Sequence, residues 1–415
     1  MERDATTILL ACLSYASEAT KTKRLAGVSA EEWRAVAELA GQHNVAPLFF
    51  HRTLRMNIVL PGDIKEKLVR AYRQDTLRTM RLYEKLSKLL QRLQEQDIPV
   101  IALKGIYLAE AVYEKIGLRA MRDIDLLVKK DNLPRVDAIL LALGCAPEDN
   151  IRVVTEDNLH FRYHFPDDAL MVEIHWSIID AIFPFQIDME ELWRRARSVT
   201  LAQAPAWTFD PEDLLLHLCL HTAKHANEMN IRMLCDINEV VRRFGMELDW
   251  QEMDERARQW NAVRAVYLIL RLAQELLDVP VPADWLVSLR PEDFSESYLD
   301  LAREQILGRY SDMKTSQLES NYLLNLLQLW GPKGLGNKLA LIRERLLPPR
   351  ETMARWYPAP VNSWRIYLYY PVRIMDILVK HRATLWQLAR GNPKARAIAE
   401  HTNQVIELRD WLMSG

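Results

Sequence analysis

Two aspartates stand two residues apart in an otherwise apolar segment, Asp123–Val128. The segment reads Asp-Ile-Asp-Leu-Leu-Val, which predicts a short and largely buried strand. Residues two apart in a strand point to the same face, so we expect the carboxylates of Asp123 and Asp125 to lie side by side. Carboxylates in such a place need cations or hydrogen-bond donors to compensate them.

A later hairpin supplies a third acid. Residues 159–165 and 170–176 alternate between apolar and polar side chains around the turn Pro166–Asp168, as antiparallel strand pairs do. Glu173 and His175 share one face of the second strand. If this strand lies beside the strand of the acid pair, Glu173 joins the two aspartates in one cluster.

An acidic cluster of this kind points to a divalent cation. Two carboxylates about 4 Å apart repel by roughly 4 kcal/mol at an effective dielectric near 20, so three are not stable together without one. Oxygen ligands favour Mg²⁺ or Mn²⁺, with water and substrate phosphates in the open positions. Such a site predicts phosphoryl or nucleotidyl transfer assisted by metal ions.

The segment before the acid pair predicts a strand, a turn and a helix. Ile98–Leu103 is an apolar run that ends at Lys104-Gly105, which indicates a buried strand opening into a turn. Tyr107–Lys115 has apolar residues at helical spacing. The lysine and glycine therefore lie between the first strand and the first helix of the predicted sheet.

This order of features resembles the DNA polymerase β-type nucleotidyltransferase superfamily. A glycine follows a strand, a helix intervenes, and the acid pair and an isolated acid lie on later strands. More closely, the chain resembles a bacterial family described as uncharacterised nucleotidyltransferases, over about residues 30–240. The motifs that carry the resemblance are Leu103–Gly105, Gly117–Val128 and Glu173–Trp176, and less specifically His221–His225 and Leu234–Asp236.

The resemblance implies a role for each matching residue. Asp123 and Asp125 correspond to the metal-binding acids. Glu173 corresponds to the third acid, which helps to deprotonate the acceptor or completes the metal shell. Lys104-Gly105 lies where most members have Gly-Ser or Gly-Gly, so the usual phosphate-binding hydroxyl is missing. Lys104 would supply a point charge instead, and Gly105 still allows the backbone to approach a phosphate.

Further charged or titratable residues near these motifs are candidates for the site. Arg119 and Arg122 flank the acid pair and either hold the triphosphate or neutralise the carboxylates structurally. Arg232 and Asp236 are one helical turn apart and would form an internal pair facing the same cleft. His175 either orients the third acid or reaches the substrate.

A row of histidines follows a strong helix start signal at Asp210–Asp213. His217, His221 and His225 share one helix face, a spacing that can hold Zn²⁺, but no glutamate lies beside the first two as in the metalloprotease pattern. The alternatives are contacts from His221 and His225 to phosphate or acceptor, which the resemblance implies, and structural hydrogen bonds.

Composition restricts the function classes. The 415 residues have a formal net charge of −2 and a pI of about 6.6. The sequence therefore gives no indication of the strongly basic surface that binds long nucleic acid. Its four cysteines are scattered, which predicts reduced thiols and a cytoplasmic location. We expect neither a secretion signal nor a membrane span.

The predicted fold class is α+β and predominantly helical, with a small mixed nucleotidyltransferase sheet and flanking helices. We expect a helical N-terminal segment at 1–97, the nucleotidyltransferase α/β core at 98–185, a helical domain lining the cleft at 186–278 and a large helical C-terminal region at 279–415. From Asp188 onward the pattern favours helices alone. A short strand at Ile151–Val154 and a glycine-rich linker at Gly331–Gly336 complete the prediction.

The functional hypothesis is a Mg²⁺-dependent (or Mn²⁺-dependent) nucleotidyltransferase. It would move an NMP from an NTP such as ATP to a small-molecule, peptide or protein acceptor and release pyrophosphate. Two alternatives stay open: metal-dependent glycosyl transfer from a nucleotide sugar, and a catalytically inactive nucleotide-binding module. The acceptor and the oligomeric state do not follow from the sequence.

Overall fold

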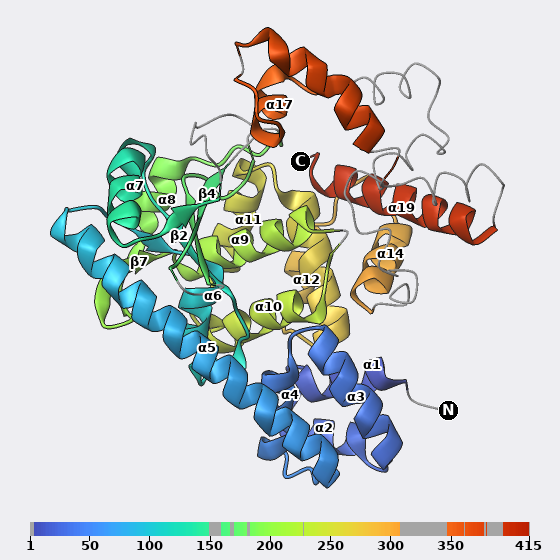
Figure 1. Ribbon diagram of the computed structural model, residues 1–415. Helices are drawn as coiled ribbons and strands as arrows, with labels where there is room; N and C mark the ends of the chain where they lie inside the picture. The colour runs from blue at the N-terminus through green and yellow to red at the C-terminus, as the bar shows by residue number, and fades with distance from the viewer. Residues whose placement is uncertain are drawn as a thin grey trace.

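Helices precede, flank and follow one mixed sheet in the computed structural model (Figure 1). The predicted α+β, predominantly helical class is therefore confirmed. No helix in the part of the chain that the structure describes has the length and apolar character to cross a membrane. The described residues are 4–148, 159–166, 170–180, 183–226, 228–307, 347–360, 362–376, 379 and 393–414.

The N-terminal segment is helical, as predicted. Ser29 and Glu32 form the capping box that begins α3. The long helix α5 buries one leucine face, on which Leu82, Leu86 and Leu93 are almost fully buried. In Figure 1 it runs from the N-terminal helices along the sheet. The bounds are α1 Ala5–Leu13, α2 Glu18–Leu25, α3 Ala30–Gln42, α4 Ala46–Arg55 and α5 Gly62–Glu95.

The sheet has seven strands in the order β3-β4-β5-β2-β1-β7-β6. The neighbours β2 and β5 are parallel, as are β1 and β7, and the remaining pairs are antiparallel. The bounds are β1 Ile101–Ala102, β2 Asp123–Leu127, β3 Ala146–Pro147, β4 His160–His164, β5 Met171–His175, β6 Arg197–Leu201 and β7 Ala204–Thr208.

Two sequence predictions are corrected here. Helices alone were expected from Asp188 onward, but β6 and β7 form a hairpin that extends the sheet beyond β1. Its turn residues Ala202 and Gln203 have φ values of +49° and +62°, so the turn lacks the Asn or Gly that usually marks it. The helix expected at Tyr107–Lys115 is instead a turn of α6 (Lys104–Tyr107) followed by the π-helical turn η1 (Leu108–Val112).

The helices after the hairpin pack beside the sheet and extend one continuous core. Asp210 caps α9 by accepting from the Asp213 amide, as its start signal predicts. The predicted strand at Ile151–Val154 and linker at Gly331–Gly336 lie outside the described residues. The remaining helices are η2 Ile116–Leu118, η3 Lys130–Asn132, α7 Leu133–Ala142, α8 Met189–Arg195, α9 Pro211–Lys224, α10 Ile231–Phe244, α11 Trp250–Gln259, α12 Val263–Leu277, α13 Ala283–Ser288, α14 Glu296–Ile306, α17 Arg350–Trp356, η6 Trp364–Leu368 and α19 Pro393–Leu412.

Candidate active site

The two aspartates and the third acid lie on neighbouring parallel strands. Asp125 of β2 is in register with Glu173 of β5, and Asp123 is two residues earlier on the same face of β2. Asp125 is buried, whereas Asp123 and Glu173 are half-buried. The sheet therefore brings together the three acids whose proximity the sequence left conditional.

Cationic and hydrogen-bonding groups compensate Asp125. His175 Nε2 lies 3.0 Å from Asp125 Oδ1, and Lys104 Nζ lies 3.7 Å from the same oxygen. Burial alone would raise the pKa of Asp125, but the Lys104 ammonium and the His175 hydrogen bond outweigh it and hold that pKa below its usual value. Asp125 is thus ionised at neutral pH.

Asp123 is compensated far less. Its carboxylate makes no hydrogen bond or ion pair with any residue in the described ranges. Burial raises its pKa, and the charges of Asp125 and Glu173 raise it further. The charges of Arg119 and Lys104 lower this pKa only in part, so Asp123 is a carboxylate without an ion-pair partner among the described residues.

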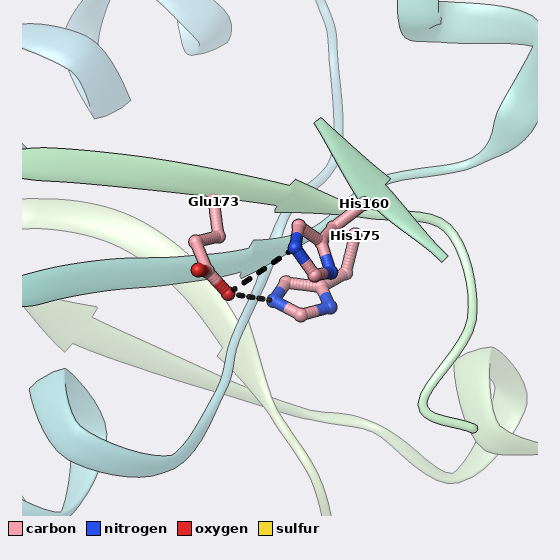
Figure 2. Close-up of side chains that lie close together, drawn as sticks. All are labelled: His160, Glu173 and His175. Atoms are coloured by element: carbon pink, nitrogen blue, oxygen red, sulfur yellow. Dashed lines mark ion pairs between the residues drawn. The ribbon is translucent and has the colours of Figure 1, made fainter. Parts of the chain in front are cut away.

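Glu173 is surrounded by three basic groups. Arg162 Nε donates to its Oε1 at 2.8 Å, and the ring nitrogens of His175 and His160 lie 3.4 and 3.9 Å from its Oε2. Burial would raise the pKa of Glu173, but the hydrogen bond to His175 and the two histidines lower it on balance. Figure 2 shows both imidazole rings turned toward this carboxylate.

The Lys104-Gly105 turn is conformationally unusual. Lys104 has a φ of +42°, in the left-handed region that favours glycine and costs other residues about 1 kcal/mol. A glycine would adopt this conformation without that cost. A Cβ on Gly105 would lie 2.5 Å from Arg119 Nη1, so this glycine makes room for an arginine side chain.

Arg119 is held in a buried ion pair. Its Nε and Nη2 each donate to Asp236 at 2.8 Å, and the Tyr113 hydroxyl donates to the same carboxylate at 2.7 Å. The pair with Asp236 occupies Nε and Nη2, which favours the structural interpretation of this arginine, while Nη1 lies beside Gly105. Arg122 is exposed and pairs with none of the described residues.

The expected pair between Arg232 and Asp236 does not form, because Asp236 is occupied by Arg119 and Tyr113. Arg232 Nε is buried and has no hydrogen-bond partner within the described ranges. Burial lowers the pKa of Arg232, as does the nearby Arg119, while Asp236 and, to a smaller extent, Asp123 act in the opposite direction. Arg232 is thus an uncommitted cation close to the acid cluster.

The histidines of α9 form a row rather than a cluster. The ring centroids of His217 and His221 are 6.3 Å apart, and those of His221 and His225 are 4.7 Å apart. Burial and the nearby Lys104 keep the pKa values of His217 and His221 far below the ordinary range. His225 is more exposed, with its Nδ1 3.8 Å from Glu228 Oε2. His217 and His221 are therefore neutral near the base of the site.

Sequence reasoning missed His160 and Arg162. Both lie on β4, where His160 is opposite His175 and Arg162 is opposite Glu173. The antiparallel pairing of β4 with β5 produces this register, so pairing the two alternating segments in the sequence would have found both residues. Among the described residues, the His160, Glu173 and His175 ligand atoms lie within 4.8 Å of one another.

The possible metal ligands at this site are of two kinds, and neither Asp123 nor Asp125 belongs to the close group that His160, Glu173 and His175 form among the described residues. Carboxylate oxygens come from two adjacent strands, and one of the three acids lacks a partner. Imidazole nitrogens of His160 and His175 lie at the edge of this group. Mn²⁺ accepts both oxygen and nitrogen ligands, whereas Mg²⁺ prefers oxygen alone.

The sequence profile of a family described as uncharacterised nucleotidyltransferases matches residues 29–278, more than half of the chain. The chain belongs to this family, and it is a transferase. The predicted family is thereby confirmed.

Comparisons outside the family add little. No curated protein matches the chain. The solution structure of the antibiotic-resistance factor ANT(2'')-Ia is similar at a TM-score of 0.34 and 13% identity, covering 47% of this chain and 98% of that one. A resemblance at this level carries no part of the assignment.

Proposed function

We propose that the protein transfers a nucleoside monophosphate from an NTP to an acceptor and releases pyrophosphate. The observation that carries the proposal is the convergence of Asp123, Asp125 and Glu173 from β2 and β5, where the pKa of Asp123 is raised on balance by burial and by the other two acids. Mg²⁺ or Mn²⁺ held by these three acids would neutralise them and polarise the α-phosphate.

The cations at the site have separate tasks. Lys104 lies against Asp125 and is 15% exposed, so its ammonium can meet the phosphates as a point charge. Arg232 has an unpartnered Nε and can do so without breaking an existing pair. Arg122, exposed beside the acid pair, is the third candidate. Together they would stabilise the charge that develops on the leaving pyrophosphate.

The transfer step requires one bond to form and one to break. An acceptor oxygen bonds to the α-phosphorus while the bond from that phosphorus to the bridging oxygen breaks. The acceptor proton passes to a carboxylate of the site, and the family resemblance assigns this task to Glu173. His175 bonds Asp125 and contacts Glu173, so it orients both acids.

Two further features bear on the proposal, the first on the type of transfer and the second on the location. The described chain before β1 is helical from α1 to α5, whereas a nucleotide-sugar transferase fold would place βαβ units there. The four cysteines are buried and free, which supports the predicted cytoplasmic location. Neither feature identifies the acceptor.

The test combines turnover with metal binding. The full chain is incubated with Mg²⁺ or Mn²⁺, each NTP and a panel of small-molecule and peptide acceptors, with UDP- and GDP-sugars as competing donors. Pyrophosphate release and mass spectrometry of the acceptors detect NMP transfer. Asp123→Asn should lower turnover by at least about 10³-fold and abolish the rise in melting temperature that Mn²⁺ gives the wild type.

Asp131→Asn is the matched control, because Asp131 is an exposed acid outside the cluster. It should retain both turnover and stabilisation by Mn²⁺. Wild-type turnover by a folded Asp123→Asn protein would refute the proposal. Sugar transfer without NMP transfer would move the assignment to the glycosyl alternative.

A further inference from the structure

A polar cavity that is separate from the acid cluster lies between the N-terminal helices and α10. Its volume is about 250 Å³, just below the roughly 300–1,000 Å³ of pockets for drug-sized ligands. The side chains that line it come from α2, α4 and α10 and from the segments after α1 and η1. The charged residues among them are Glu18, Lys21, Arg52, Arg55, Glu114 and Arg242.

The acids of this cavity are already committed to its arginines. Arg52 Nη2 donates to both carboxylate oxygens of Glu239 at 2.7 and 2.8 Å. Glu239 is not itself among the residues that line the cavity. Arg55 bonds Glu114 at 2.6 Å and lies 3.4 Å from Glu18. These pairs leave one cation in excess.

Lys21 is that excess cation. Its residue is only 3% exposed, it lines the cavity, and its side chain makes no hydrogen bond or ion pair with any residue in the described ranges. A buried and unpaired ammonium is costly. Burial, with Arg52 and Arg242 nearby, lowers the pKa of Lys21 to about 8, so it is still mostly protonated at neutral pH.

Arg242 completes the cationic side of the cavity. Its guanidinium lies 4.5 Å from the Tyr15 ring centroid, and its Nη2 donates to Ser14 O at 3.2 Å. Its Nε is buried without a hydrogen-bond partner and lies 3.8 Å from Glu239 Oε1, a carboxylate that already bonds Arg52. Guanidinium groups match the planar geometry of carboxylates and phosphates.

We propose that this cavity binds a small molecule through a phosphate or carboxylate group, with Lys21 as the central contact and Arg55 and Arg242 beside it. The site is separate from the acid cluster and does not depend on the proposed transfer reaction. Its wall is nevertheless connected to the ion pair of Arg119 and Asp236. Glu114 follows Tyr113, which bonds Asp236, and Glu239 lies one turn after Asp236 on α10.

The test is calorimetric titration of the full chain with inorganic phosphate and, separately, with succinate. Lys21→Met should weaken binding at least about tenfold, and Arg55→Gln should weaken it as well. Lys23→Met is the matched control, since Lys23 is exposed on the same helix and does not line the cavity. Tighter binding of phosphate or of succinate identifies which group the site prefers.

Lys104→Met separates this site from the candidate active site. Binding should survive in that variant and be lost in Lys21→Met. The proposal is overturned if Lys21→Met binds as the wild type does, if only Lys104→Met loses binding, or if neither anion binds the wild type at millimolar concentration. Melting curves of each variant establish that it is folded.

Discussion

Arg119 and Asp236 form a bidentate ion pair that joins the segment just before β2, the strand of Asp123 and Asp125, to helix α10. The two hydrogen bonds are 2.8 Å each, and both side chains are almost fully buried. The partners are 117 residues apart in sequence. The pair holds the Arg119 side chain in place beside Gly105 and commits two of its nitrogens to Asp236.

Breaking this pair should cost stability more than it costs substrate binding. Arg119→Met leaves Asp236 buried with only the Tyr113 hydroxyl, so we expect a loss of about 3–5 kcal/mol in the free energy of unfolding. Arg122→Met, at an exposed neighbour, should change it by less than about 0.5 kcal/mol. Urea unfolding followed by circular dichroism measures both. Equal stability of the two variants would contradict this interpretation.

Because Lys104 has a positive φ, we expect two variants that both lack the lysine charge to differ in stability. Lys104→Gly and Lys104→Met both remove the ammonium beside Asp125, so both should lose affinity for NTP. Only the glycine variant relieves the positive φ, and it should be more stable than the methionine variant by about 1 kcal/mol. Thermal unfolding of the pair isolates this effect, and a methionine variant as stable as the glycine variant would exclude strain at this residue.

Arg232 should affect substrate affinity without supporting the fold. Arg232→Met removes a cation that has an unpartnered buried Nε, so the free energy of unfolding should stay the same or rise. The KM for NTP should rise by about tenfold, which corresponds to one charge-assisted contact of about 1.4 kcal/mol. Steady-state kinetics with an acceptor from the panel that supports turnover measure it. An unchanged KM would remove Arg232 from the phosphate contacts.

Lys21 predicts a pH-dependent stability difference. Burial, with Arg52 and Arg242, lowers its folded-state pKa from 10.5 to about 8, against the charge of Glu239. Below pH 8 the folded state bears the full cost of the charge, and the cost fades as the pH rises toward the unfolded pKa. Lys21→Met should therefore stabilise the protein by on the order of 3 kcal/mol at neutral pH and by little near pH 10.

Urea unfolding at both pH values checks this prediction, with Lys23→Met as the variant that should show no difference. A gain in stability that is the same at both pH values would mean that apolar packing, rather than the buried charge, stabilises the Lys21→Met protein.

Short sequence patterns were sufficient to predict on which strand or helix, and on which of its faces, several site residues lie. The two-residue spacing placed Asp123 and Asp125 on one face, and the alternating hairpin placed Glu173 on its strand. The start signal at Asp210 positioned α9. These predictions hold because side-chain direction in a strand or helix follows from the position along it.

Only the tertiary structure decided which residues from distant segments meet. Asp236 is one turn from Arg232 in sequence, yet it pairs with Arg119, because packing of α10 against η1 brings that guanidinium to it. The β6–β7 hairpin joins the sheet beside β1 although its turn lacks glycine. Lys21 is unpaired because the nearby acids bond arginines of α4. The sequence of α2 alone does not show which cations those acids bond.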